Sequence, residues 1–293
     1  MFVSALKRLL PAWVKERLGG VVARQRLREA ERAVARFRRA DGRPHELPGE
    51  LIVSLTSYPP RYPTLAKTLK SLLAQTVRAD RTILWLEDKH VGSLPDEVRE
   101  LTSQGLEIRT CVNIRSYNKL IHTLVDFPDG YVVTADDDVY YPPDWLAVLV
   151  GAVTPGEKVI VCRRAHKPLG RDGDFGPYKH WHWELVTHGE VRDDLFPTGV
   201  GGVLYPPRSL APEVTDTAAL RRLAPTADDV WLFCMAKRAG TRHRQVGGRF
   251  PLINWDGSQE IGLEHENVLE ANDVQLRAVW SEYCADLEPS PTR

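Results

Sequence analysis

Three consecutive aspartates, Asp136, Asp137 and Asp138, follow a run of β-branched and aromatic residues at positions 131–134. Such a run predicts a strand that is buried among apolar neighbours. Three carboxylates at the end of a buried strand would lose their water and repel one another unless a cation neutralises them. Mg²⁺ and Mn²⁺ prefer carboxylate oxygens, and in proteins they usually also hold substrate phosphates. The triplet therefore predicts a divalent metal site for a phosphorylated substrate, the alternative being an acidic turn that caps the helix after Asp144.

A second acidic pair, Asp228 and Asp229, directly precedes an apolar run at residues 230–233 that predicts a helix. One acid can cap this helix while its neighbour projects into a cleft, and the helix N-terminus stabilises the ionised form. The alternative is that both acids only cap the helix.

Strands and helices alternate along the chain between these motifs. The expected strands cover residues 51–55, 82–86, 106–109 and 131–134, with helices at residues 65–73, 95–101 and 118–124. The alternation predicts an α/β fold with a mostly parallel sheet flanked by helices. Ligands of such sheets bind beyond the carboxyl ends of the strands. At those ends the chain carries polar residues at 56–61, 87–88 and 136–138.

The charge of the chain is unevenly distributed. The 293 residues contain 39 Lys and Arg and 39 Asp and Glu, and 43% are hydrophobic, which suffices for one large core. Residues 1–45 hold twelve Lys and Arg against four Asp and Glu, so they carry +8 and residues 46–293 carry −8. We therefore expect a basic amphipathic helical extension at 1–45 and one α/β domain at 46–293. The acidic domain argues against nucleic acid as a partner.

The extension reads as two helices separated by Gly19 and Gly20. The second carries Leu27, Ala30, Val34 and Phe37 on one face and arginines on the other, and the first gathers its apolar residues on one side: Phe2, Leu6, Leu9, Leu10, Trp13 and Val14. No stretch reaches the roughly 20 apolar residues that span a bilayer, and the segment is too charged for a secretory signal. The pattern predicts helices lying on anionic lipid, where each basic residue contributes about 1 kcal/mol. The alternative is packing on the domain or against a second subunit, as in a homo-oligomer.

The four cysteines are scattered and show no metal-binding pair spacing, which favours a reducing compartment. Together with the basic extension, this predicts a cytoplasmic protein that is peripheral on the inner face of the cell membrane.

Five segments together resemble the nucleotide-sugar glycosyltransferases of the Rossmann-like GT-A fold, close to the family-two enzymes of bacterial polysaccharide assembly. They are the acidic triplet, which matches the family's DxD motif, and residues 53–58, 116–120, 199–203 and 226–231. The resemblance runs from Leu51 to about Tyr283. It implies a GT-A fold, a nucleotide-diphosphate sugar donor, expected to be a UDP-sugar, and Mn²⁺ or Mg²⁺ as cofactor.

The resemblance also implies roles for residues that bind the donor. Asp138 would ligate the metal, Asp136 would face the ribose and the metal, and a late histidine, His265 or His243, could complete the metal site. The rest of the donor site would comprise Thr56, Tyr58, Arg61, Glu87 or Asp88, Lys119 and Asp137.

At the acceptor, which would be a saccharide or a lipid-linked saccharide, the resemblance implies a loop with Gly201 and Gly202. Trp231 would either stack on an acceptor sugar or pack in the core. A sugar hydroxyl that attacks an anomeric carbon needs a proton acceptor, and in inverting relatives the second of the paired acids supplies it. That residue is Asp229, with Asp228 beside it.

Two other functions use the same acids. A metal-dependent nucleotidyltransferase or phosphohydrolase would show a glycine-rich phosphate loop after the first strand, where this chain has Pro59 and Pro60. A non-catalytic scaffold at the membrane surface would not need acids at both the metal and the base positions.

Overall fold

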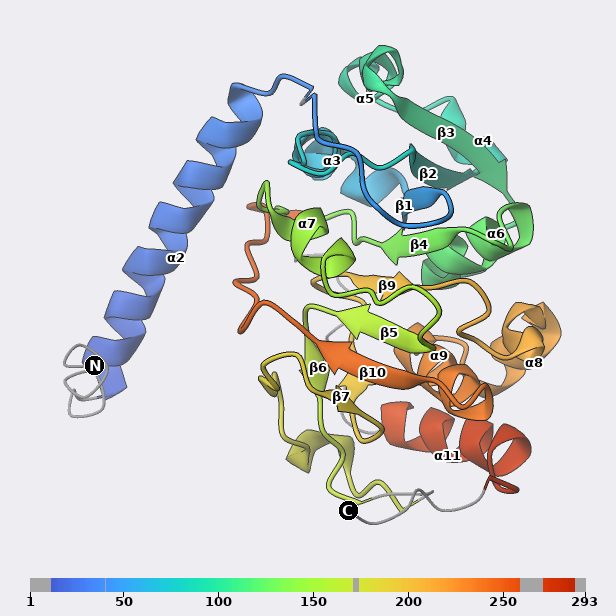
Figure 1. The fold of residues 1–293 in the computed structure, drawn as a ribbon. Helices are drawn as coiled ribbons and strands as arrows, with labels where there is room; N and C mark the ends of the chain where they lie inside the picture. The colour runs from blue at the N-terminus through green and yellow to red at the C-terminus, as the bar shows by residue number, and fades with distance from the viewer. Residues whose placement is uncertain (1–11, 40, 171–173, 259–270, 288–293) are drawn as a thin grey trace.

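The body of the protein is built on one eight-stranded sheet (Figure 1). The computed structural model describes residues 12–39, 41–170, 174–258 and 271–287. The strand order is β3-β2-β1-β4-β9-β5-β10-β7, with a separate two-stranded sheet β6-β8. The strands are β1 Leu51–Thr56, β2 Arg81–Glu87, β3 Leu106–Cys111, β4 Tyr131–Thr134, β5 Val159–Cys162, β6 Ala165–His166, β7 Val191–Arg192, β8 Phe196–Pro197, β9 Val203–Tyr205 and β10 Arg242–Gln245.

The sheet is mostly parallel. Strand β1 pairs in parallel with β2 and β4, β2 with β3, and β5 with β10, whereas β9 runs antiparallel between β4 and β5 and β7 runs antiparallel to β10. The central strands β1, β2 and β4 are buried almost throughout because their residues are β-branched or otherwise apolar. All four predicted strands are confirmed.

Helices cover the sheet on both faces, each over its own hydrophobic core. One core contains residues of α3 Tyr62–Leu73, α5 Asp96–Glu100 and α7 Trp145–Val150, and the other contains residues of α6 Asn118–Asp126, α8 Thr217–Leu223, α9 Asp228–Arg238 and α11 Ala271–Tyr283. The remaining helical segments are short: α4 Asp88–Val91, η1 Pro59–Arg61, η2 Leu101–Gln104, η3 Arg115–Tyr117, η4 Tyr178–His180 and η5 Pro212–Thr215. The predicted α/β fold is confirmed.

The N-terminal extension differs from its prediction. A single helix, α2, runs over Ala12–Ala35 without a break at Gly19 and Gly20, so the expected division into two helices is wrong. Glycine costs a helix only about 1 kcal/mol, and good helix formers on both sides offset that cost. Residues 1–11, with most of the predicted apolar cluster of the first helix, lie outside the described residues. No helix within the described residues is both long and apolar enough to cross a bilayer.

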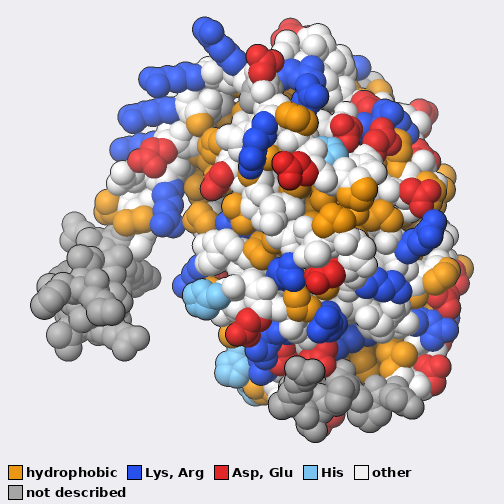
Figure 2. Space-filling model, in the orientation of Figure 1, with side chains coloured by type: hydrophobic (Ala, Val, Ile, Leu, Met, Phe, Trp, Pro, Cys, Tyr) orange, Lys and Arg blue, Asp and Glu red, His pale blue; other side chains and the backbone are white. Residues whose placement is uncertain are grey.

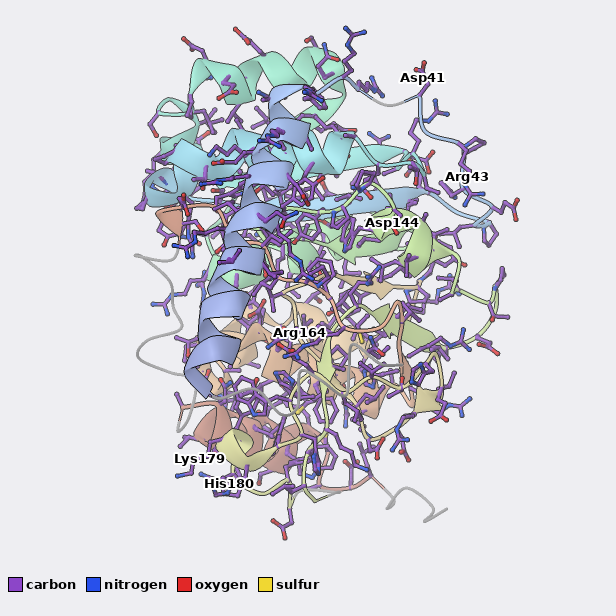
Figure 3. The ribbon with its side chains drawn as sticks, turned by 90° about the vertical axis from the view of Figure 1, so that its left-hand side faces the viewer. Asp41, Arg43, Asp144, Arg164, Lys179 and His180 are labelled. Carbon is purple, nitrogen blue, oxygen red and sulfur yellow. The ribbon has the colours of Figure 1, made fainter. Side chains whose placement is uncertain are left out.

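The C-terminal half of α2 packs on the body through Trp255. The Trp255 side chain is fully buried and forms a small core with Ala30 and Val34, against which Leu27 also packs. Figures 1 and 3 show α2 running alongside the body as a separate rod. Arg24, Arg26, Arg28 and Arg32 are exposed, and Figure 2 shows basic side chains on the side of α2 that faces away from the body. The predicted apolar face is confirmed for Leu27, Ala30 and Val34, whereas Phe37 lies beyond the end of the helix and packs against the core under α3.

We expect this contact to hold α2 against the body. The substitution Ala30→Asp would place a carboxylate in the contact with Trp255, where it would lose its water. We expect α2 to separate from the body more often as a result. Trypsin should then cleave after the arginines of residues 24–39 faster by roughly tenfold or more. Ala33→Asp makes the same change three residues on, at an exposed position, and should keep wild-type protection. Equal cleavage of both variants would contradict a holding role for this contact.

Candidate active site

The acidic triplet lies directly after β4, at the edge of the sheet where β1 and β2 also end. Each of its three carboxylates has a partner from a different element. Lys119 Nζ of α6 lies 2.8 Å from Asp136 Oδ1, and Arg61 NH1 of η1 lies 2.7 Å from Asp138 Oδ2. The hydroxyl of Ser57, just after β1, donates to Asp137 Oδ2 at 2.5 Å.

The backbone of the triplet is also held by three separate contacts. The Asp136 N–H donates to the Tyr141 hydroxyl at 2.7 Å, and the Asp137 carbonyl accepts from the Thr68 hydroxyl at 2.9 Å. The Trp255 N–H donates to the Asp138 carbonyl at 3.3 Å. Trp255 Nε1 donates in turn to the Thr68 hydroxyl at 2.8 Å, so the residue that seats α2 also holds two residues of the triplet.

Burial and mutual repulsion shape the charges of this turn. Burial is the main cause that raises the pKa of Asp137 to about 7; the Ser57 hydrogen bond opposes it, and the charge of Asp138 adds to it. Burial alone would lower the pKa of Arg61, but the charges of Asp138 and Asp137 leave it above its ordinary value. Arg61 also donates to the Ser258 carbonyl, which ties the turn to the segment after Trp255.

Lys119 links the triplet to the second acidic pair. Its ammonium is buried and lies 3.3 Å from Asp228 Oδ2 as well as 2.8 Å from Asp136. Burial alone would lower the pKa of Lys119, yet the carboxylates of Asp136, Asp228 and Asp229 raise it well above its ordinary value. One buried cation therefore joins the end of β4 to the start of α9.

Asp229 lies on the other side of this cation. Its Oδ1 accepts a hydrogen bond of 2.8 Å from the Gly199 N–H. Burial, and next the charge of Asp228, raise the pKa of Asp229, while Lys119 opposes the shift. Neither acid makes a capping hydrogen bond to α9, whose N-cap is Ala227, so the predicted capping role is wrong. Both acids lie in the first turn, where the helix dipole still favours their negative charge.

The other predicted donor residues lie at the same edge. Thr56 Oγ1 donates to the Trp85 carbonyl at 2.9 Å and accepts from Asn118 Nδ2 at 3.3 Å. Tyr58 is 39% exposed. Glu87 ends β2 and pairs with Lys89 at 2.8 Å, while Asp88 begins α4 and is exposed.

The predicted acceptor residues are buried. Gly201 and Gly202 have φ of +97° and +96°, and a Cβ on Gly202 would lie 2.5 Å from the Trp145 ring, so packing alone requires glycine there. Trp231 is fully buried and donates from Nε1 to the Val214 carbonyl at 3.0 Å. Of its two predicted positions, the core is the observed one, so the Trp231 side chain offers no surface to an acceptor.

Only one of the two predicted late histidines, His243, lies within the described residues. His265 lies outside the described residues. His243 is buried in β10 beside Phe233, and burial lowers its pKa to about 3. Within the described ranges, no group of three or more His, Cys, Asp or Glu side chains is placed to hold a metal.

Asp136 and Asp138 nevertheless fit a divalent cation as two hard oxygen donors at a phosphate site. Mg²⁺ in particular is often held by one or two carboxylates, with substrate phosphates and water as the other ligands. Both carboxylates already lie against cationic groups, which shows that this turn attracts positive charge.

Sequence reasoning missed several residues that build the site. Ser57 and Asn118 stand inside the quoted segments and could have been chosen for their polar side chains. Thr68 and Tyr141 have ordinary helix and loop surroundings in the sequence, and nothing about Trp255 signals a contact with residue 138.

One comparison with known proteins identifies a family. A family model described as glycosyl transferase family 2 matches residues 56–203, about half of the chain. No curated protein matches significantly.

Three solved structures are similar at low identity. Glucosyl-3-phosphoglycerate synthase from Mycobacterium tuberculosis, in complex with Mn²⁺ and UDP, has 22% identity and a TM-score of 0.30, over 39% of this chain and 43% of that one. A mannosyltransferase from Pyrobaculum calidifontis, in complex with GDP-Man and Mn²⁺, has 16% identity and a TM-score of 0.36, over 76% and 61%. The inositol-1-phosphate CTP transferase from T. maritima has 11% identity and a TM-score of 0.39, over 71% and 86%. This chain thus covers less than half of the first of these structures, and at such TM-scores the likeness carries no argument about function.

We expect Lys119→Met to leave the half-buried carboxylates of Asp136 and Asp228 without their buried counterion. Breaking a buried ion pair in this way costs about 3–5 kcal/mol of unfolding free energy, measured by urea denaturation. Adding Asp228→Asn should restore part of the loss, because the two changes act on one ion pair. Lys158→Met, at an exposed lysine, serves as the control. A loss for Lys119→Met as small as for the control would contradict the linking role.

Proposed function

Because the chain belongs to glycosyltransferase family 2, we propose that it transfers a sugar from a nucleotide-diphosphate donor to a saccharide or lipid-linked saccharide acceptor, with Mn²⁺ or Mg²⁺ as cofactor. The donor is expected to be a UDP-sugar, and the setting to be cell-surface polysaccharide assembly. Mn²⁺ and nucleotides occur in two of the similar structures.

One observation carries this proposal. The two acidic motifs, which are 92 positions apart when Asp136 and Asp228 are compared, meet at a single buried ammonium, that of Lys119. A transferase that joins two substrates needs a site for the donor phosphates next to a site for the attacking hydroxyl. A phosphohydrolase needs the first site and a water, so the second carboxylate pair favours transfer.

In the donor site, Asp136 and Asp138 would hold the metal, which when bound neutralises the charge of the diphosphate. Arg61 and Lys119 stand beside these carboxylates and would attract the phosphate oxygens by charge. Tyr58 would pack on the base of the nucleotide. Glu87 lies at the end of β2 and could accept from the N–H of a uracil.

In the acceptor site, Asp229 is the proposed general base. Its Oδ2 is not engaged by the Gly199 N–H, which bonds Oδ1. A raised pKa suits a base, because proton transfer is most efficient when the pKa of the base lies near the operating pH. The single displacement that such a base assists inverts the anomeric centre.

The basic face of α2 supports a place at an anionic membrane surface. Arg24, Arg28 and Arg32 lie on one side of the helix at intervals of four residues and are exposed. We propose peripheral attachment on the inner face of the membrane. Pairing of α2 with a second subunit stays the alternative.

The first prediction from this function concerns the metal. Asp138→Ala should abolish transfer and weaken Mn²⁺ binding, measured by calorimetry, by roughly tenfold or more because a carboxylate ligand is lost. Asp129→Ala, at an exposed acid on the surface, should behave as wild type. Full activity of Asp138→Ala, or of the wild type in EDTA, would refute the metal assignment.

The second prediction concerns the base. Asp229→Asn keeps the size of the side chain and its acceptor oxygen for Gly199 but removes proton uptake, so turnover should fall by roughly 10²- to 10⁴-fold. Binding of UDP with Mn²⁺ should survive. If Asp228→Asn is inactive and Asp229→Asn is active, Asp228 is the base; if both turn over normally, a retaining reaction without this base is the better account.

The third prediction concerns the membrane. Changing Arg24, Arg28 and Arg32 to Gln should weaken sedimentation with anionic vesicles by roughly 100-fold, at about 1 kcal/mol per residue. Wild-type binding should also weaken as salt rises. The matched control changes the exposed Arg208, Arg242 and Arg277 to Gln. If both triple variants bind like the wild type, the membrane contact is not on α2.

A further inference from the structure

Arg163 is a buried arginine without an ionic partner among the described residues. It follows β5 directly, and its N–H donates to the Gly202 carbonyl at 3.1 Å. The residue is 8% exposed. No carboxylate of the described ranges lies within ion-pairing distance of its guanidinium, and its Nε has no hydrogen-bond partner there. Arginine is almost never buried unpaired, because the lost hydration is not recovered.

The side chain is nevertheless held in a closely fitted place. A Cβ on Gly247 would lie 2.7 Å from Arg163 Cζ, so the guanidinium lies directly against the backbone there. On another side its Cζ lies 5.4 Å from the centre of the Phe250 ring, a cation–π distance. A Cβ on Gly201 would lie 3.6 Å from Arg163 Cβ and 3.2 Å from Phe250. The fold thus fixes a guanidinium that no ion pair of the described residues neutralises, although the charge of Asp144 acts on it from farther away.

The surroundings of Arg163 form a small surface pocket with an excess of positive charge. Its lining contains three cations and one anion, namely Arg163, Arg164, Arg249 and Glu184. Glu184 is already shared, since its Oε1 lies 3.4 Å from Arg164 Nε and its Oε2 lies 2.5 Å from Arg249 Nε. Arg164 and Asp144 lie on the face that α2 crosses (Figure 3).

The strand register places this pocket beside the active site. Val203 of β9 pairs with Thr134 of β4 on one side and with Cys162 of β5 on the other. The acidic triplet and Arg163 therefore leave the sheet at the same level, two strand spacings or about 10 Å apart.

The segment between β8 and β9 connects the pocket to the proposed base. Arg164 NH1 donates to the Thr198 hydroxyl at 3.1 Å, and the next residue, Gly199, donates to Asp229. Gly202, at the other end of this loop, accepts from Arg163. The loop 199–202 thus contacts the proposed base at one end and Arg163 at the other.

We propose that Arg163, with Arg164 and Arg249, binds an oxyanion carried by the acceptor, namely a phosphate or carboxylate group. A guanidinium offers paired N–H donors that match either group. The inference rests on the proposed transferase function for the identity of the molecule, but the anion site itself does not depend on it. The donor diphosphate is the other source of such an anion, and it is expected at the triplet instead.

The test uses the full chain and measures binding, not activity. Calorimetry with inorganic phosphate should show binding to the wild type, weaker by about tenfold or more in Arg163→Gln because charge-assisted hydrogen bonds are lost. Arg242→Gln, at an exposed arginine, should match the wild type. Binding of UDP with Mn²⁺ should be the same in all three proteins.

Stability provides a second readout. If Arg163 serves binding, its replacement by Gln should leave the unfolding temperature unchanged or raise it, since an unpaired buried charge is removed. The exposed Arg249→Gln keeps the test valid if the first variant fails to fold, and it should also weaken phosphate binding.

Three results would overturn the proposal. They are absence of phosphate binding by the wild type, equal binding by wild type and both pocket variants, or loss of UDP binding in Arg163→Gln. The last would assign the guanidinium to the donor diphosphate. Failure of the transferase function would leave the phosphate titration unaffected, so the two failures are distinguishable.

Discussion

The placement of three carboxylates at the end of a buried strand is the constraint on which this structure depends. Each carboxylate needs a hydrogen-bond donor or a cation as its partner, and no single helix or strand supplies all three partners. The fold draws Lys119 from α6, Arg61 from η1 and Ser57 from the end of β1. The carboxylates that follow β4 therefore fix these three elements at one edge of the sheet. This is the edge at which ligands of α/β sheets bind.

The N-terminal helix shares in this arrangement through Trp255. The ring of Trp255 packs against Ala30 and Val34, and its two N–H groups reach the Asp138 carbonyl and the Thr68 hydroxyl. Thr68 in turn holds the Asp137 carbonyl. The helix that carries the exposed arginines is thus two contacts away from the acidic triplet. A force on α2 at a membrane surface would act on the same tryptophan that positions the triplet.

How far the sequence predicts this structure depends on the range of each interaction. Local patterns predicted the strands, the main helices and the ends at which polar residues collect, because apolar periodicity reports burial directly. The acids of both motifs could be chosen from their positions next to such elements. The sequence left Trp231 open between an acceptor contact and the core, because a buried indole and an exposed one look the same in a sequence; the structure places it in the core. Trp255 and Arg163 depend on contacts with distant segments, at Asp138 and Gly247, which no local pattern contains.

Lys119 sets the distance between the two halves of the site, and α6 sets the position of Lys119. One turn further along α6, the buried Thr123 hydroxyl lies 2.8 Å from the Ser54 hydroxyl of β1 and accepts from Trp85 Nε1 of β2 at 2.8 Å. These buried polar contacts seat the helix on two strands at once, so sliding it would leave polar groups unpaired. The ammonium is consequently held where it contacts Asp136 and Asp228 together. Transfer between two bound substrates requires their reacting atoms to be aligned within a few tenths of an ångström. A single buried cation, fixed by its own helix, holds the end of β4 and the start of α9 together; under the proposed function it would contribute to that alignment.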